Sequence, residues 1–217
     1  MNELSRRSLL TMVALPPLAA MLPDAATDAA TGFAPATEGF ARRRIQEQHL
    51  PNVPLLTQDG ERVRFYDDLV KDKIVTLNFF YADCDDICPM VTSNLAKVQK
   101  LLGDCVGRTV FMYSFTLKPE NDTVDVIKHY REMSGAGPGW TFLTGKPADI
   151  ENLRKAIGFT YPDPAIDKDT TQHIGNVRYG NEPLMLWAAC PGMAHASFIA
   201  ESVSWMVHPE TNRVQKP

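Results

Sequence analysis

Short apolar runs alternate with amphipathic stretches along most of the chain. Residues 73–80 (KIVTLNFF) form a compact, largely apolar run suited to a buried central strand. In residues 88–102 the apolar side chains recur three or four positions apart, which predicts an amphipathic helix. The same patterns predict further strands at residues 61–65, 108–115 and 140–143, and further helices at residues 124–133 and 147–157.

The C-terminal third adds a hairpin and a closing helix to this alternation. Residues 174–179 and 184–188 read as two strands, and Gly180-Asn181 between them is a hairpin turn signal. Residues 161–171, rich in Pro and Asp, predict a loop, and residues 198–207 predict a helix. Strands alternating with helices favour an α/β fold with a central mixed sheet flanked by helices. We expect one domain spanning residues 51–207, with residues 208–217 as a C-terminal tail.

The first 30 residues are typical of an export signal (twin-arginine-like) rather than of a folded domain. Arg6-Arg7 resembles a twin-arginine signal, and an ordinary secretory signal is the competing interpretation. The apolar stretch at residues 9–22 is shorter than the roughly 20 residues that span a bilayer, and Pro16-Pro17 interrupts it. We therefore expect a periplasmic or otherwise exported protein without a permanent membrane span, and association with the membrane remains an open alternative. Residues 31–50 are expected to be a linker or N-terminal arm, in which residues 41–49 form a short helix or extended arm.

Composition and charge narrow the possible functions. The chain has 217 residues, 44% of them hydrophobic and 22% charged, which is ordinary for a soluble globular protein. Its formal charge of −4 argues against a nucleic-acid partner, which needs a basic surface. The one dense basic run, Arg42-Arg43-Arg44, is explained by a solvated helix face.

The candidate functional motif is Cys84-Asp85-Asp86-Ile87-Cys88-Pro89, which follows the predicted strand at 73–80 and begins the next predicted helix. Unpaired N–H groups and partial positive charge at a helix N-terminus favour the thiolate, the form that attacks disulfides and binds metals. The four-residue spacing suits both two ligands on one soft ion and a redox pair. Asp85 and Asp86 oppose thiolate formation, and a bound cation would relieve that conflict. A purely structural disulfide would close so short a loop that it would restrain the unfolded chain little.

Two further cysteines and four further histidines are candidates for less specific roles. Cys105 and Cys190 could pair with each other, or Cys190 could be a buried free thiol beside a turn. A second soft site of Cys190, Met193 and His195 is conceivable. His49, His129, His195 and His208 are interpreted as surface residues.

Several segments together resemble the Sco/SenC family. The run from Leu77 to Pro89 (LNFFYADCDDICP) is similar to that family's apolar strand followed by C-x-x-x-C-P. Residues 118–123 (KPENDT) resemble its Asp-Pro-Glu-x-Asp-Thr loop, and residues 142–145 (FLTG) resemble a strand end. His173 falls 85 residues after Cys88, about where the family places its ligand histidine. The chain departs from the family pattern at four positions, which are Asp85, Lys118, Gln172 and Ile174.

The resemblance implies a thioredoxin-like fold that binds one copper ion, Cu(I) or Cu(II), through Cys84, Cys88 and His173. It also implies a metallochaperone rather than an enzyme that turns over. Such an assembly factor delivers copper to, or reduces the cysteines of, the dinuclear copper site of cytochrome c oxidase. The expected partners are the copper-bearing oxidase subunit and a thiol reductant or copper donor protein.

Three alternatives remain beside this interpretation. The first is a thiol-disulfide oxidoreductase that acts on exported proteins through Cys84 and Cys88. The second, zinc at the two thiolates, is less favoured because thiolates select soft Cu(I) and imidazole also accepts Cu(II). The third, a peroxiredoxin, is disfavoured because residues 78–84 do not supply the polar cradle that such enzymes place before their cysteine.

Overall fold

The computed structural model describes residues 36–169, 172 and 175–207. The predicted export signal, the C-terminal tail and His173 lie outside the described residues. The compact unit begins at Arg42, within helix α1 (Ala36–His49). Helix α1 contains the short helix expected at residues 41–49 and begins five residues earlier, at Ala36. Within the described residues, we find no helix with the length and apolarity to cross a membrane.

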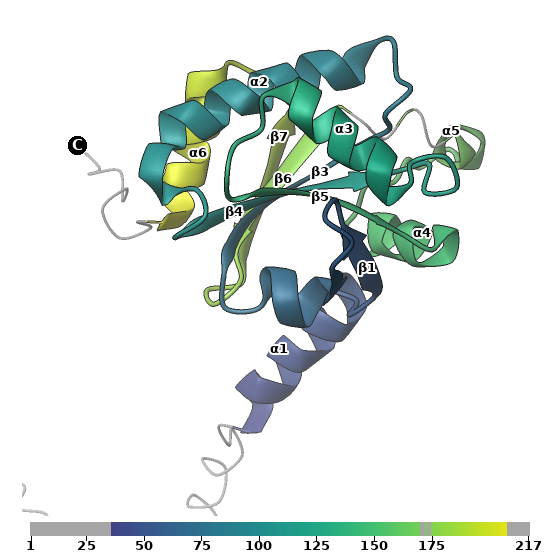
Figure 1. The fold of residues 1–217 in the computed structure, drawn as a ribbon. Helices are drawn as coiled ribbons and strands as arrows, with labels where there is room; N and C mark the ends of the chain where they lie inside the picture. Colours follow the sequence, from purple (N-terminus) through teal and green to yellow (C-terminus); the bar gives the residue numbers. More distant parts are fainter. Residues whose placement is uncertain (1–35, 170–171, 173–174, 208–217) are drawn as a thin grey trace, which may run out of the picture. The chain divides into compact units, whose positions relative to one another are not determined.

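A seven-stranded mixed sheet forms the centre of the unit (Figure 1). Its strand order is β2-β1-β5-β4-β3-β6-β7. Strand β4 pairs in parallel with β3 and with β5, and all other neighbouring strands in the sheet are antiparallel. The strands are β1 (Pro54–Thr57), β2 (Arg62–Arg64), β3 (Ile74–Phe80), β4 (Val110–Thr116), β5 (Trp140–Gly145), β6 (Asn176–Asn181) and β7 (Leu186–Pro191).

Helices cover both faces of this sheet, as the sequence predicts. Figure 1 shows α2, α3 and α6 over one face, and α4 on the other. These helices are α2 (Ile87–Leu102), α3 (Val124–Ser134), α4 (Pro147–Ala156) and α6 (Ala196–Val207). Short helical segments are η1 (Phe65–Val70), η2 (Gly103–Cys105) and α5 (Pro164–Lys168). Helix α5 lies within the stretch predicted to be a loop.

Strand β3 lies in the centre of the core, since all seven of its residues are buried. Successive side chains point to opposite faces of a sheet. Phe79 therefore packs on one face against Phe115 and Phe159, with ring centroids 5.6 and 4.8 Å away. Phe80 stacks on the other face against Tyr130 of α3, at 4.8 Å. This double anchoring fixes the end of β3, from which the cysteine loop departs.

The predicted turn at Gly180-Asn181 is wrong. Both residues belong to β6, and the turn lies between Asn181 and Leu186. Gly180 is paired with Trp187, and a Cβ atom on Gly180 would lie 2.4 Å from the indole ring. The glycine is therefore needed for ring packing within the strand. Pro183, which lacks a backbone N–H, belongs to the turn itself.

Candidate metal and thiol site

Both candidate cysteines lie at the junction between β3 and α2, as predicted. Cys84 lies in the loop that follows β3, and Cys88 is the second residue of α2. Both side chains are buried, with 5% and 1% exposed. The two residues do not share one helical face, because α2 begins only at Ile87.

The Cys84 thiol lies just before the N-terminus of α2. Asp86 precedes the helix but its side chain makes no capping hydrogen bond. Hydrogen bonding from the backbone of Asp86 and Cys88 contributes to lowering the pKa of the Cys84 thiol. The first N–H groups of a helix have no partner within the helix, so a negatively charged acceptor there is stabilised.

The two thiols differ sharply in acidity. Burial alone raises the pKa of Cys84, but hydrogen bonds from the Tyr81 hydroxyl, the Cys88 thiol and the backbone outweigh it and lower the pKa. Burial raises the pKa of Cys88, and its hydrogen bond to Cys84 raises it further. Cys84 is thus the more acidic of the two thiols and the one that ionises first.

A second loop, residues 117–123, holds the cysteine loop from the side. Lys118 Nζ lies 3.0 Å from Asp83 and 4.0 Å from the centroid of the Tyr81 ring. The Tyr81 hydroxyl is the same group that hydrogen-bonds to Cys84. Lys118, which departs from the family pattern, therefore places a cation against the tyrosine that contacts the thiolate.

Asp122 joins the two loops from within the core. Its buried carboxylate accepts hydrogen bonds from the Thr116 hydroxyl and from the Ala82 N–H, the latter at 3.1 Å. Burial raises the pKa of Asp122, and these hydrogen bonds oppose the rise. Tyr81 and Asp122 are site residues that our sequence reasoning did not single out, although both lie within the motifs quoted for the resemblance.

The third predicted ligand, His173, lies outside the described residues. Its neighbour Gln172 is described and exposed, and the Gln172 carbonyl accepts a hydrogen bond from the Tyr161 hydroxyl at 3.0 Å. Across the described ranges, no three His, Cys, Asp or Glu side chains form a group that could hold a metal ion. The described part of the site therefore offers two candidate metal ligands, the sulfurs of Cys84 and Cys88.

The remaining cysteines do not form the suggested disulfide. Cys105 is exposed in η2, Cys190 is buried in β7, and all four cysteines are free thiols. Burial raises the pKa of Cys190, which keeps this thiol protonated. His129 lines a cavity of about 530 Å³ beside the cysteine loop, together with Asp83 and Tyr130.

The SCO1/SenC family model matches residues 44–207, which includes the junction, the 117–123 loop and the hairpin. The chain belongs to the SCO1/SenC family. A SCO1 homolog of Bacillus subtilis is 30% identical over 98 residues, which cover 44% of this chain and 49% of that protein. The chain spans less than two thirds of the length of the curated relatives it matches.

Solved Sco structures show the same fold. Copper-bound ScoI of Bradyrhizobium japonicum matches with a TM-score of 0.56 and 20% identity, over 70% of this chain and 96% of that one. BsSco, described as having a disulfide switch and as a member of the Sco family of cytochrome c oxidase assembly proteins, matches with a TM-score of 0.57 and 22% identity, over 72% and 92%. The predicted thioredoxin-like fold class is thereby confirmed.

Proposed function

We propose that this protein is an exported copper-binding assembly factor for cytochrome c oxidase. Its substrate would be a copper ion, held by Cys84, Cys88 and His173 and passed to the copper-bearing oxidase subunit. Family membership supports this proposal, as do the copper-bound ScoI and the oxidase assembly role given for BsSco. The single observation that carries it is the pair of buried sulfurs at one strand-to-helix junction, where hydrogen bonding lowers the pKa of Cys84.

The residues present fit a soft metal ion. Thiolates are the preferred ligands of Cu(I), and imidazole suits both oxidation states of copper. Hydrogen bonding from Tyr81 and from the backbone lowers the pKa of Cys84, which favours binding of this residue as a thiolate. The pKa of Cys88 is raised, so this thiol has to release its proton on binding, and copper affinity should therefore increase as the pH rises.

The acidity difference also favours a second function, exchange of thiols with a protein disulfide. The Cys84 thiolate would attack one sulfur of the substrate disulfide and release the other sulfur as a thiolate. Cys88, after losing its proton, would then attack the Cys84 sulfur. That step forms the Cys84–Cys88 disulfide and releases the reduced substrate. A reduced oxidase subunit would thus be produced together with an oxidised form of this protein.

Metal titration under anaerobic, reducing conditions tests the copper proposal. We expect the reduced protein to retain about one Cu(I) per chain after gel filtration. Cys84→Ser and Cys88→Ser should each abolish stoichiometric retention, whereas the matched control Cys105→Ser should not. Retention by both site variants would refute the proposed ligands.

Thiol labelling tests the redox function independently. The metal-free, oxidised protein should expose two additional reactive thiols after mild reduction, at Cys84 and Cys88. Newly reactive thiols at Cys105 and Cys190 instead would show that the wrong pair had been chosen.

We further propose that Arg6 and Arg7 direct export. Fractionation of the native host should then recover the mature protein outside the cytoplasm. Arg6→Lys combined with Arg7→Lys should retain a twin-arginine substrate inside, whereas an ordinary secretory signal would tolerate the exchange. Full-length protein confined to the cytosol of the unmodified host would contradict the proposal.

A further inference from the structure

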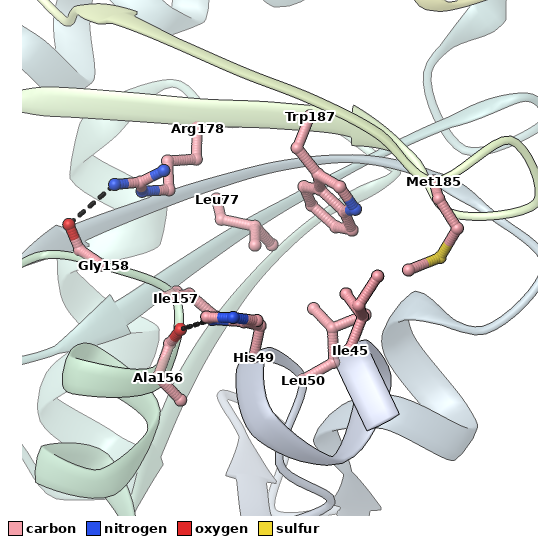
Figure 2. A pocket seen from close by; sticks show the side chains of 10 residues that line it. All are labelled: Ile45, His49, Leu50, Leu77, Ala156, Ile157, Gly158, Arg178, Met185 and Trp187. Carbon is pink, nitrogen blue, oxygen red and sulfur yellow. Dashed lines mark hydrogen bonds between the residues drawn. The ribbon is translucent and has the colours of Figure 1, made fainter. Parts of the chain in front are cut away.

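A cavity of about 350 Å³ lies over the β3–β6–β7 part of the sheet (Figure 2). Its floor is formed by Leu77 and Trp187, and its walls include Ile45 of α1 and Ile157 at the end of α4. None of the residues that line it belongs to the cysteine loop or to the 117–123 loop. The volume falls in the lower part of the range for small-molecule pockets, about 300–1,000 Å³.

One arginine lines this largely apolar cavity. Figure 2 shows Arg178 of β6 beside Leu77, with its guanidinium directed toward Gly158. Arg178 Nη2 donates to the Gly158 carbonyl at 2.7 Å, and the guanidinium carbon lies 5.4 Å from the Phe159 ring centroid. Gly158 permits this approach, because a Cβ atom there would lie 2.6 Å from Arg178 Nη2. The guanidinium is therefore held in place.

Arg178 has no carboxylate within ion-pair distance in the described part of the chain. Arg154 provides the contrast, since its buried guanidinium is paired with both Glu151 and Asp167. Arg178 also lines a second cavity, of about 200 Å³, whose lining includes Asn176 and Cys190 but no acidic residue. Arg178 is partly buried, and this loss of solvent lowers the pKa of its guanidinium.

A guanidinium carries five N–H donors in a planar fork that matches a carboxylate. The carbonyl of Gly158 accepts from only one of its terminal nitrogens. A single negative charge would balance it, and the apolar walls would suit a hydrocarbon body rather than a sugar or a nucleotide. We propose that this cavity binds a small amphipathic carboxylate such as a medium-chain fatty acid, with the carboxylate on Arg178 and the chain against Leu77, Ile45 and Trp187.

Titration of the full chain with decanoate, and in parallel with decanol, tests this site without copper. The indole N–H resonance of Trp187 reports occupancy of the cavity directly. A charge-assisted, bidentate contact should make decanoate bind about tenfold to a hundredfold more tightly than decanol. Equal affinities for the two ligands, or shifts that spare Trp187, would overturn the proposal.

Matched arginine variants identify the anion-binding group. Arg178→Gln should reduce decanoate affinity to that of decanol while leaving decanol binding unchanged. The control Arg62→Gln, at an exposed position of β2, should change neither affinity. If Arg178→Gln does not fold, Arg178→Lys keeps the charge but loses the fork, and it should still narrow the preference for decanoate. An undiminished preference in either variant would show that Arg178 is not the anchor.

Discussion

Removing the Tyr81 hydroxyl should make Cys84 a weaker acid. Burial alone raises the pKa of Cys84, and the Tyr81 hydroxyl is the foremost of the groups that reverse this effect. A hydrogen bond to a charged group contributes about 1.5–3 kcal/mol. Since one pKa unit corresponds to 1.36 kcal/mol, Tyr81→Phe should raise the pKa of Cys84 by about 1–2 units. Because Tyr81→Phe removes only the hydroxyl oxygen, the packing of the aromatic ring should not change.

The consequence can be measured as the rate of exchange with a small aromatic disulfide across a series of pH values. A higher pKa leaves less thiolate at neutral pH, but each remaining thiolate is more nucleophilic, with a Brønsted coefficient of about 0.4–0.5. The two effects together make Tyr81→Phe about three- to tenfold slower below both pKa values. The midpoint of the pH profile should move upward by the same 1–2 units, to within about half a unit.

A second tyrosine provides the matched control. The Tyr66 hydroxyl donates to Glu182 Oε1 at 3.1 Å, away from the cysteine loop. Tyr66→Phe should cost some folding stability but leave the pH profile of Cys84 unchanged. If Tyr81→Phe also leaves that profile unchanged, the hydrogen bond from Tyr81 does not set the acidity of Cys84.

Two further predictions concern folding. Gly180→Ala should lower the free energy of unfolding, measured in urea, by about 1–3 kcal/mol, because the new methyl group would collide with the Trp187 ring. The control Gly175→Ala places its methyl group in open space and should change the free energy of unfolding by less than about 0.5 kcal/mol. Equal effects of the two changes would contradict the packing argument. Burial raises the pKa of Asp122 above 3.8, so its stabilising contribution is complete below that value and declines as pH rises through the folded-state pKa. Asp122→Asn should remove this decline in urea unfolding between about pH 3 and pH 7, unlike the exposed control Asp104→Asn, and an unaltered pH dependence would show that Asp122 is not the group responsible.

The local patterns were sufficient to predict the framework of the site. A largely apolar run followed by helical periodicity placed Cys84 and Cys88 at a strand-to-helix junction, where the structure has them. Both signals depend only on neighbours in the sequence. For the same reason the closing helix and the parallel strands were found to within a few residues.

The features missed depend on contacts between distant residues. Asp122 reaches Ala82 across 40 positions, and nothing local shows which carboxylate of an acidic loop will be buried. The turn was misplaced because Gly180-Asn181 carries a strong local signal. That signal is overridden by Trp187, whose ring needs the space above the glycine. The unequal acidity of the two thiols likewise arises from Tyr81 and from burial.

The role of His173 is the most direct test of the copper proposal. A thiol-disulfide oxidoreductase needs two sulfurs and no imidazole, whereas Cu(II) held by two thiolates needs a further ligand that suits it. Absorption spectroscopy of Cu(II)-loaded protein, with the Cys84–Cys88 disulfide measured in parallel, separates the two functions. We predict that His173→Ala strongly weakens Cu(II) binding and abolishes the thiolate-to-copper absorption, while the disulfide still forms and His195→Ala changes neither. Unchanged Cu(II) affinity and an unchanged spectrum in His173→Ala would contradict the account.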